Sequence, residues 1–117
     1  MITSFKELIV WQKSMELAKG VYLLTSQLPK NELYGISSQM QRSAVSIPSN
    51  IAEGHKRGTR KDYSQFLKIA LGSAAELETQ ILLVEDIYKP LEVKKFIDLV
   101  IEVQKILTVI IKKLSVE

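Results

Sequence analysis

The sequence predicts an all-α protein, an up-down-up-down bundle of four helices in one domain spanning residues 1–117. Apolar residues recur at helical spacing through four segments, and short links containing proline or glycine separate these segments. The alternation of apolar and polar residues that is typical of strands is nowhere sustained. Five glycines and three prolines in 117 residues leave room for few turns, which favours long elements.

The first helix is expected to begin after Ser4 and to run to about Gln27, where Leu28-Pro29-Lys30-Asn31 ends it. Ser4 with Glu7 three residues later is the pattern of a capping box. A mostly apolar helical stripe follows, made of Phe5, Leu8, Met15, Ala18, Tyr22 and Thr25.

The second helix is expected to begin between Asn31 and Gly35 and to end at Gly54, interpreted as the glycine that follows a helix. Its apolar stripe is Ile36, Met40, Ala44, Ile47 and Ile51. Pro48 lies inside this segment and removes one helical hydrogen bond. Because the stripe continues beyond the proline, we expect the helix to bend there and not to end.

The third helix has the most regular pattern. Thr59 and Asp62 form a second capping-box pattern, and Lys89-Pro90 closes the segment. Between them, apolar residues follow one another at alternating steps of four and three, as in a heptad seam. The seam is Tyr63, Leu67, Ala70, Ala74, Leu77, Ile81, Val84 and Tyr88. Residues 72–75 are small, so a neighbour can approach closely there.

The fourth helix is expected to start near Leu91 or Glu92 and to run almost to the last residue. Its stripe is Val93, Phe96, Ile97, Val100, Val103, Leu107, Ile110 and Leu114. Charged residues interrupt the apolar pattern, and no uninterrupted apolar run approaches the roughly 20 residues that a membrane span needs. We therefore expect no membrane contact.

Apolar residues occupy more helix faces than one core needs. The additional ones are Val10, Leu17, Val21 and Leu24 on the first helix, Ile69, Leu71, Leu82, Leu83 and Ile87 on the third, and Leu99, Ile101, Ile106 and Val109 on the fourth. Either the core is wide or one face is buried between subunits. We favour the subunit interface, and hence a homo-oligomer.

The composition excludes several kinds of site. Without cysteine there is no disulfide, no thiolate nucleophile and no cysteine-ligated metal, and one histidine is too few for a paired Glu-x-x-His di-metal centre. We expect no cofactor, no metal and no enzymatic activity. The amino-terminal residues lack the basic and apolar regions of a signal peptide, so a soluble cytoplasmic protein is expected.

Positive charge is concentrated in one stretch between the second and third helices. The net charge is +3, but the segment from His55 to Lys68 carries +4 and the rest of the chain −1. The segment does not match the phosphate-loop pattern G-x-x-x-x-G-K-[ST], because Thr59 follows the second glycine where lysine is needed. Nucleotide hydrolysis is therefore not expected.

This basic segment is nevertheless a candidate site for nucleic-acid phosphate. The start of the third helix offers unpaired N–H groups and a positive dipole end, with Arg57, Arg60 and Lys61 around it. Such contacts set position and read no base sequence. His55 could add stacking or a pH-dependent charge. The alternative is a solvated basic loop in which His55 is simply exposed.

Three blocks of residues stand in order along the chain. They are Phe5-x-x-Leu8-x-Val10-Trp11, Gln39-x-x-Arg42-Ser43-Ala44-x-Ser46-Ile47-Pro48-x-Asn50-Ile51-Ala52-Glu53-Gly54 and Phe66-Leu67-x-Ile69-Ala70-x-Gly72-Ser73-x-x-Glu76-Leu77. Together they resemble the four-helix-bundle proteins encoded in 23S rRNA intervening sequences. Ser14 is one departure, because that family leads us to expect alanine there.

The resemblance implies a left-handed bundle that assembles as a ring, typically a homopentamer, in a family without established enzymatic activity. The chain is also similar to the accessory variability protein of diversity-generating retroelements, which implies a basic ring that binds nucleic acid and partners a reverse transcriptase. On this chain the candidate nucleic-acid-binding residues are Arg42, His55, Lys56, Arg57, Arg60 and Lys61.

Two functions are thus expected. The first is a non-enzymatic oligomer that binds RNA or DNA non-specifically through the basic loop. The alternative is a protein-interaction scaffold ring with no direct nucleic-acid binding.

Overall fold

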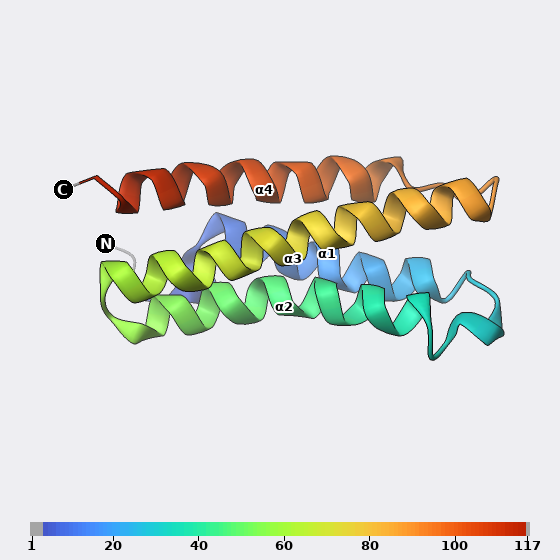
Figure 1. Ribbon diagram of the computed structural model, residues 1–117, viewed down its shortest axis with the longest axis horizontal. Helices are drawn as coiled ribbons and strands as arrows, with labels where there is room; N and C mark the ends of the chain where they lie inside the picture. The colour runs from blue at the N-terminus through green and yellow to red at the C-terminus, as the bar shows by residue number, and fades with distance from the viewer. Residues whose placement is uncertain (1–3, 117) are drawn as a thin grey trace.

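The computed structural model describes residues 4–116 and contains four long helices. The elements in order are η1 (Phe5–Glu7), α1 (Ile9–Thr25), η2 (Lys30–Glu32), α2 (Ile36–Arg57), α3 (Arg60–Ile87) and α4 (Lys94–Leu114). They form an elongated bundle of 47 × 20 × 20 Å in which successive helices run in opposite directions (Figure 1). The all-α class and the sequential four-helix bundle are as predicted.

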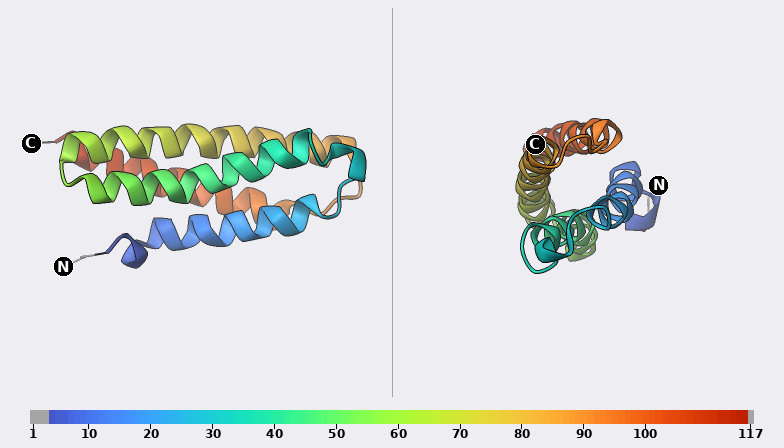
Figure 2. Two further views of the ribbon diagram at one scale, coloured as in Figure 1. Left: turned by 90° about the horizontal axis from the view of Figure 1, so that it is seen from below. Right: turned by 90° about the vertical axis from the view of Figure 1, so that its right-hand side faces the viewer.

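Each helix packs against two others around a common axis (Figure 2). The α1 helix contacts α2 and α4, and α3 also contacts α2 and α4, whereas the diagonal pairs do not meet. The packing between α2 and α3 is the most extensive, and that between α1 and α4 is the least. The end of α2, the start of α3 and the end of α4 therefore lie at one end of the bundle.

The core contains most of the predicted stripes of α2, α3 and α4, but only Ala18 and Thr25 of the stripe predicted for α1 are buried. The buried residues of α1 are Val10, Ser14, Leu17, Ala18, Val21, Leu24 and Thr25. Met15 is only half-buried and Tyr22 is 50% exposed, although both were placed on the core stripe. The sequence of α1 has two apolar faces, and the more aliphatic of them faces the core.

Ser14, the departure from the family pattern, is fully buried. Its hydroxyl donates a 2.9 Å hydrogen bond to the carbonyl of Trp11, so the buried polar group has a partner. The family resemblance led us to expect alanine here, and serine is accommodated without an unsatisfied donor.

The amino-terminal capping box is present, but it caps a shorter element than predicted. Ser4 and Glu7 form the reciprocal box around η1, not around α1. The backbone is extended at Leu8, and α1 begins only at Ile9. At its other end α1 stops at Thr25, two residues before the predicted Gln27.

The predicted end of α2 at Gly54 was also wrong. The helix runs unbroken through Pro48, as predicted, and continues to Arg57. Gly58 ends it, with a left-handed φ of +87° that favours glycine. Gly54 is buried instead, and a Cβ there would lie 2.6 Å from the Cβ of Phe66. Gly54 therefore allows the close approach of α2 and α3.

The start of α3 and the start of α4 lie closer to their predicted positions. Thr59 caps α3, since its hydroxyl accepts a 3.1 Å hydrogen bond from the N–H of Asp62. The α4 helix begins at Lys94, slightly later than predicted. Within residues 4–116, no helix is both long and apolar enough to cross a membrane.

Candidate nucleic-acid interface

The basic segment predicted as a loop is mostly helical. His55, Lys56 and Arg57 form the last turn of α2, and Arg60 and Lys61 open α3. Only Gly58 and Thr59 lie between the two helices. The basic side chains therefore project from helix turns whose backbone is fixed by helical hydrogen bonds.

The positive charge of Arg57 is partly neutralised by an ion pair within the chain. Its guanidinium lies 3.0 Å from the Glu53 carboxylate, one helical turn earlier. The same group stands over the ring of Phe66, 4.9 Å from the ring centre. The ion pair holds Arg57 along α2, and the contact with Phe66 reaches across the α2–α3 packing. The side chain remains half-exposed, so an anion can still reach its free edge.

Arg60 has a structural role that the sequence did not reveal. Its guanidinium donates to the carbonyl of Lys113 at 2.9 Å and to that of Val116 at 3.0 Å. Carbonyls at a helix end lack partners within the helix. Arg60 donates to one such carbonyl, Lys113, which also accepts from the N–H of Val116 at 3.3 Å, and to the carbonyl of Val116 just beyond α4. This contact brings Lys112 and Lys113 to the same end of the bundle, and sequence reasoning missed both. The signal that could have found them is the antiparallel order, which places the end of α4 beside the start of α3.

His55 packs on a neighbouring ring and is not an exposed loop residue. Its imidazole meets Tyr63 edge to face, with 5.7 Å between ring centres, and the histidine is half-buried. Burial raises the pKa of the Tyr63 hydroxyl. The structure thus places His55 in the α2–α3 packing, beside the basic residues but partly shielded from solvent.

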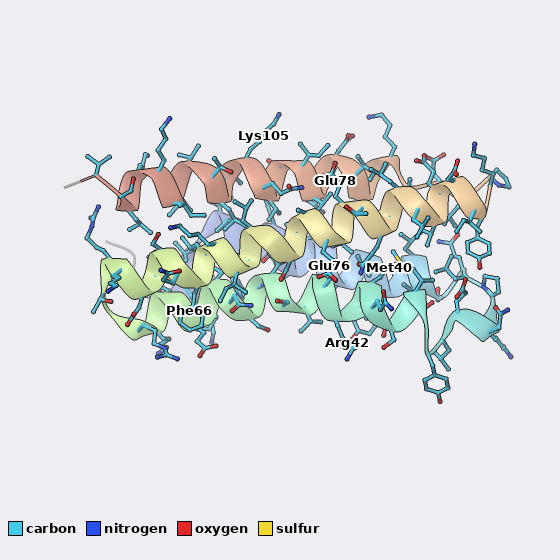
Figure 3. The ribbon with its side chains drawn as sticks, viewed as in Figure 1. Met40, Arg42, Phe66, Glu76, Glu78 and Lys105 are labelled. Carbon is cyan, nitrogen blue, oxygen red and sulfur yellow. The ribbon has the colours of Figure 1, made fainter. Side chains whose placement is uncertain are left out.

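Arg42 does not join the basic end. It precedes Arg57 by 15 residues on α2, which is about 22 Å at the helical rise. Figure 3 labels Arg42 well along α2 from Phe66, the residue beneath Arg57. Arg42 is exposed and makes no hydrogen bond or ion pair with any residue from 4 to 116. The predicted set of six is therefore divided between two places.

Four lysines at the basic end are exposed and lack partners for their ammonium groups within the described chain. They are Lys56, Lys61, Lys112 and Lys113. The first turn of α3 also directs N–H groups outward, with Asp62 as the one acidic residue in that turn. We define the basic end as these four lysines together with Arg57 and Arg60. The described residues contain no group of three potential metal-ligating side chains.

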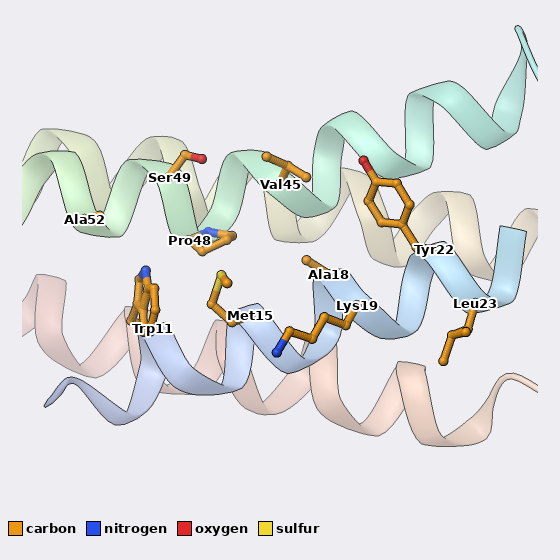
Figure 4. A pocket seen from close by; sticks show the side chains of 10 residues that line it. All are labelled: Trp11, Met15, Ala18, Lys19, Tyr22, Leu23, Val45, Pro48, Ser49 and Ala52. Carbon is orange, nitrogen blue, oxygen red and sulfur yellow. The ribbon is translucent and has the colours of Figure 1, made fainter. Parts of the chain in front are cut away.

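A second surface feature lies between α1 and α2, on the outside of the bundle. It is an apolar groove of about 650 Å³. Trp11, Met15 and Tyr22 line it from α1, and Val45 and Pro48 line it from α2 (Figure 4). The half-buried and exposed residues of α1 that were predicted to face the core are thus on this groove.

Comparison with known proteins gives the family. The family model for the 23S rRNA-intervening sequence protein matches residues 6–111. A crystal structure from Bacteroides thetaiotaomicron, described as a protein with unknown function from the S23 ribosomal protein family, is 30% identical with a TM-score of 0.80. That similarity covers 89% of this chain and 96% of the other. No curated protein matches the chain. The chain therefore belongs to the 23S rRNA-intervening sequence protein family, as its three sequence blocks indicated.

Proposed function

We propose that the protein is a non-enzymatic homo-oligomer that binds RNA or DNA through its basic end, without strong base preference. The observation that supports this most is the gathering of Lys56, Lys61, Lys112 and Lys113 from three helices at one end of the bundle. The basic residues are spread over 58 positions of sequence, from Lys56 to Lys113, and the fold brings them together.

Lysine ammonium groups suit phosphate as compact point charges, and their binding to a nucleic acid releases condensed counterions. Among the described residues of the basic end, the two arginines are engaged within the chain and the four lysines carry compact point charges, which suit phosphates better than base edges. The neighbouring rings of His55, Tyr63 and Phe66 already make contacts inside the chain. We therefore expect contacts to phosphates that are indifferent to sequence.

One protomer offers few contacts, so binding by a single copy is weak. In a ring whose axis runs parallel to the bundle, every basic end would point to the same face. Several modest sites on one face then act on one polyanion, and their combined avidity exceeds that of any single site. Both the ring and a reverse transcriptase partner remain expectations drawn from the family resemblance.

The test is a salt titration of binding to fluorescent RNA and DNA. In the test variant, Lys56, Lys61, Lys112 and Lys113 are changed to glutamine, which leaves the structural contacts of Arg57 and Arg60 in place. The log–log slope against salt should fall by about 3 for each protomer engaged. The matched control removes four charges elsewhere, by changing Lys30, Lys89, Lys94 and Lys95 to glutamine. Equal binding by the two variants, or no salt-dependent binding by the wild type, would overturn the proposal.

The scaffold function is the second candidate, and the apolar groove between α1 and α2 favours it. A protein partner would bury this groove, whereas phosphate would not. On this alternative the wild type binds neither RNA nor DNA at low salt, while it still assembles with protein. The same titration therefore separates the two functions.

A further inference from the structure

The apolar groove between α1 and α2 is shaped by large side chains around an open centre. Trp11, Met15 and Tyr22 stand along α1, and Val45 and Pro48 form the opposite wall on α2 (Figure 4). Lys19 also lines the groove, and it forms no hydrogen bond or ion pair with any residue from 4 to 116. The groove is thus an apolar surface with one unpaired positive charge at its edge.

A complementary stripe runs along the outward side of α3. Its members are Ile69, Gly72, Glu76, Thr79 and Leu83, at alternating steps of three and four. All five are exposed, with Ile69 at 52% and Leu83 at 49%. A Cβ at Gly72 would meet nothing within 4 Å, so the helix backbone is open to close approach. This stripe is a second helical seam that the core does not use.

We propose that the outward stripe of α3 in one copy docks into the α1–α2 groove of the next copy. The inference rests on the homo-oligomer of the proposed function and assigns the surfaces that form it. Large groove side chains face a helix with glycine at its middle, as in helix-in-groove recognition. Apolar residues lie toward both ends of the stripe, at Ile69 and Leu83, and bury against apolar walls.

Charge complementarity supports a second copy of the chain as the occupant. Glu76 of the stripe, like Lys19 of the groove, has no hydrogen bond or ion pair within residues 4–116. Opposite charges on the two surfaces fix the position of the stripe along the groove and favour a second copy of this chain over other partners. A wholly apolar partner would leave Lys19 without a counter-charge.

The two charged residues also lie at similar levels along the bundle. Glu76 and Arg42 border one small hollow between α2 and α3. Arg42 and Tyr22 border the adjacent hollow between α1 and α2, and Lys19 precedes Tyr22 by one turn. Rotation about an axis parallel to the bundle preserves these levels. Pairing of Lys19 in one copy with Glu76 in the next would therefore need no shift along the axis.

The groove and the stripe are different surfaces, so the contact is head-to-tail. Such contacts generate a ring when the rotation closes and a filament when it does not. Closure about an axis parallel to the bundle also places every basic end on one face. The docking thus supplies the arrangement that multivalent binding needs.

The first test compares two matched substitutions by size-exclusion chromatography with light scattering. Leu83→Arg on the stripe should convert the oligomer to protomers of 13.3 kDa. Val109→Arg changes an apolar residue of α4 with similar exposure, 52%, outside both surfaces, and should leave the oligomer intact. A monomeric wild type, or an intact oligomer in both variants, would overturn the docking.

The second test uses mixing, which also controls for folding. Val45→Glu places a charge in the groove and leaves the stripe unchanged, whereas Leu83→Arg places a charge on the stripe and leaves the groove unchanged. Each variant alone should therefore be monomeric. Their mixture should form a one-to-one dimer, because one variant keeps an intact groove and the other an intact stripe. A mixture that stays monomeric would contradict the head-to-tail assignment.

Charge reversal tests the proposed pair directly. Lys19→Glu and Glu76→Lys should each weaken assembly, and the double variant should restore it. A double variant weaker than both singles would overturn the pairing. These measurements need no nucleic acid, so a failure of RNA and DNA binding by the basic end would leave the docking unaffected. Conversely, a monomeric wild type that still binds RNA would overturn the docking and the homo-oligomer but not nucleic-acid binding by the basic end.

Discussion

The guanidinium of Arg60 donates a 2.9 Å hydrogen bond to the main-chain carbonyl of Lys113, and this bond ties the start of α3 to the end of α4. A second bond reaches the carbonyl of Val116. The contact holds the last turn of α4 beside the basic residues of α2 and α3, where the antiparallel order of the helices places it. A residue predicted as a phosphate ligand is thus also a clamp between two helix ends.

Removing this clamp should loosen the end of α4. Arg60→Ala is expected to lower the free energy of unfolding by about 1 kcal/mol, since the contact is exposed and only partly offsets hydration. Amide hydrogen exchange in the last turn of α4 should accelerate by more than that in its middle. Lys61→Ala is the control, because Lys61 has no side-chain partner within residues 4–116. Equal exchange in the two variants would contradict the role assigned to Arg60.

Two glycines should respond in opposite ways to alanine. At Gly54 the added methyl would meet Phe66 at 2.6 Å, so Gly54→Ala should cost about 1–3 kcal/mol of unfolding free energy through overpacking. At Gly72 the space is open, and Gly72→Ala should stabilise the protomer by up to about 1 kcal/mol through helix propensity. Urea unfolding in dilute solution, where assembly does not contribute, measures both. A stabilising Gly54→Ala would show that the helices can separate at no cost.

The left-handed residue between α2 and α3 gives a third prediction. Gly58→Ala should destabilise the protein by about 1 kcal/mol, because an alanine at φ +87° is strained. Gly58→Asn should cost less, since asparagine adopts this conformation more readily. Thermal unfolding of the two variants provides the comparison. Identical midpoints for alanine, asparagine and glycine would mean that α2 ends without need of this conformation.

The pH dependence of one tyrosine is also predicted. The Tyr88 hydroxyl donates to the Glu32 carboxylate, and this hydrogen bond is the main cause that raises the pKa of Tyr88 above its ordinary 10.0. Burial and the charge of Glu32 raise the pKa further. The folded chain therefore holds this proton more tightly than the unfolded chain does. The resulting stabilisation is complete below pH 10.0 and is lost as the pH rises through the raised pKa.

Glu32→Gln removes the carboxylate and should lower the pKa of Tyr88. Titration of ring-labelled tyrosine by NMR follows the phenol of each residue, and Tyr88→Phe assigns the signal. An unchanged titration in Glu32→Gln would exclude the carboxylate as the main cause.

Local patterns predicted much of the fold. The seam of α3 and the cap at Thr59 depend on spacing within one or two turns, and the structure confirms them. The capping box at Ser4 also forms, but around η1 and not around α1. The core face of α1 was not decided by such spacing, because α1 is apolar on two faces. Only the positions of α2 and α4 determine which face is buried. Likewise, Gly54 and Gly58 are both glycines near a helix end, and only packing against Phe66 distinguishes their roles.

In the candidate site too, contacts within one helix could be predicted from local spacing, whereas contacts between helices could not. The pairing of Arg57 with Glu53 spans one helical turn and could have been inferred from the sequence. The contact of Arg60 with Lys113 spans 53 positions, and no local pattern encodes it. Arg42 was grouped with the basic segment by family resemblance, and the length of α2 separates them.

The two-residue connection at Gly58 and Thr59 has a consequence for the order of folding. Closing so short a loop costs little chain entropy, and α2 and α3 are the helices that pack most extensively. We expect this hairpin to be largely formed in the folding transition state, with φ-values highest along its seam. The pair α1 and α4 has the weakest contact and the greatest separation along the chain, so it should join last. In the native state the contact between α1 and α4 should then open first, so unfolding should begin on the side of the bundle opposite the α2–α3 hairpin.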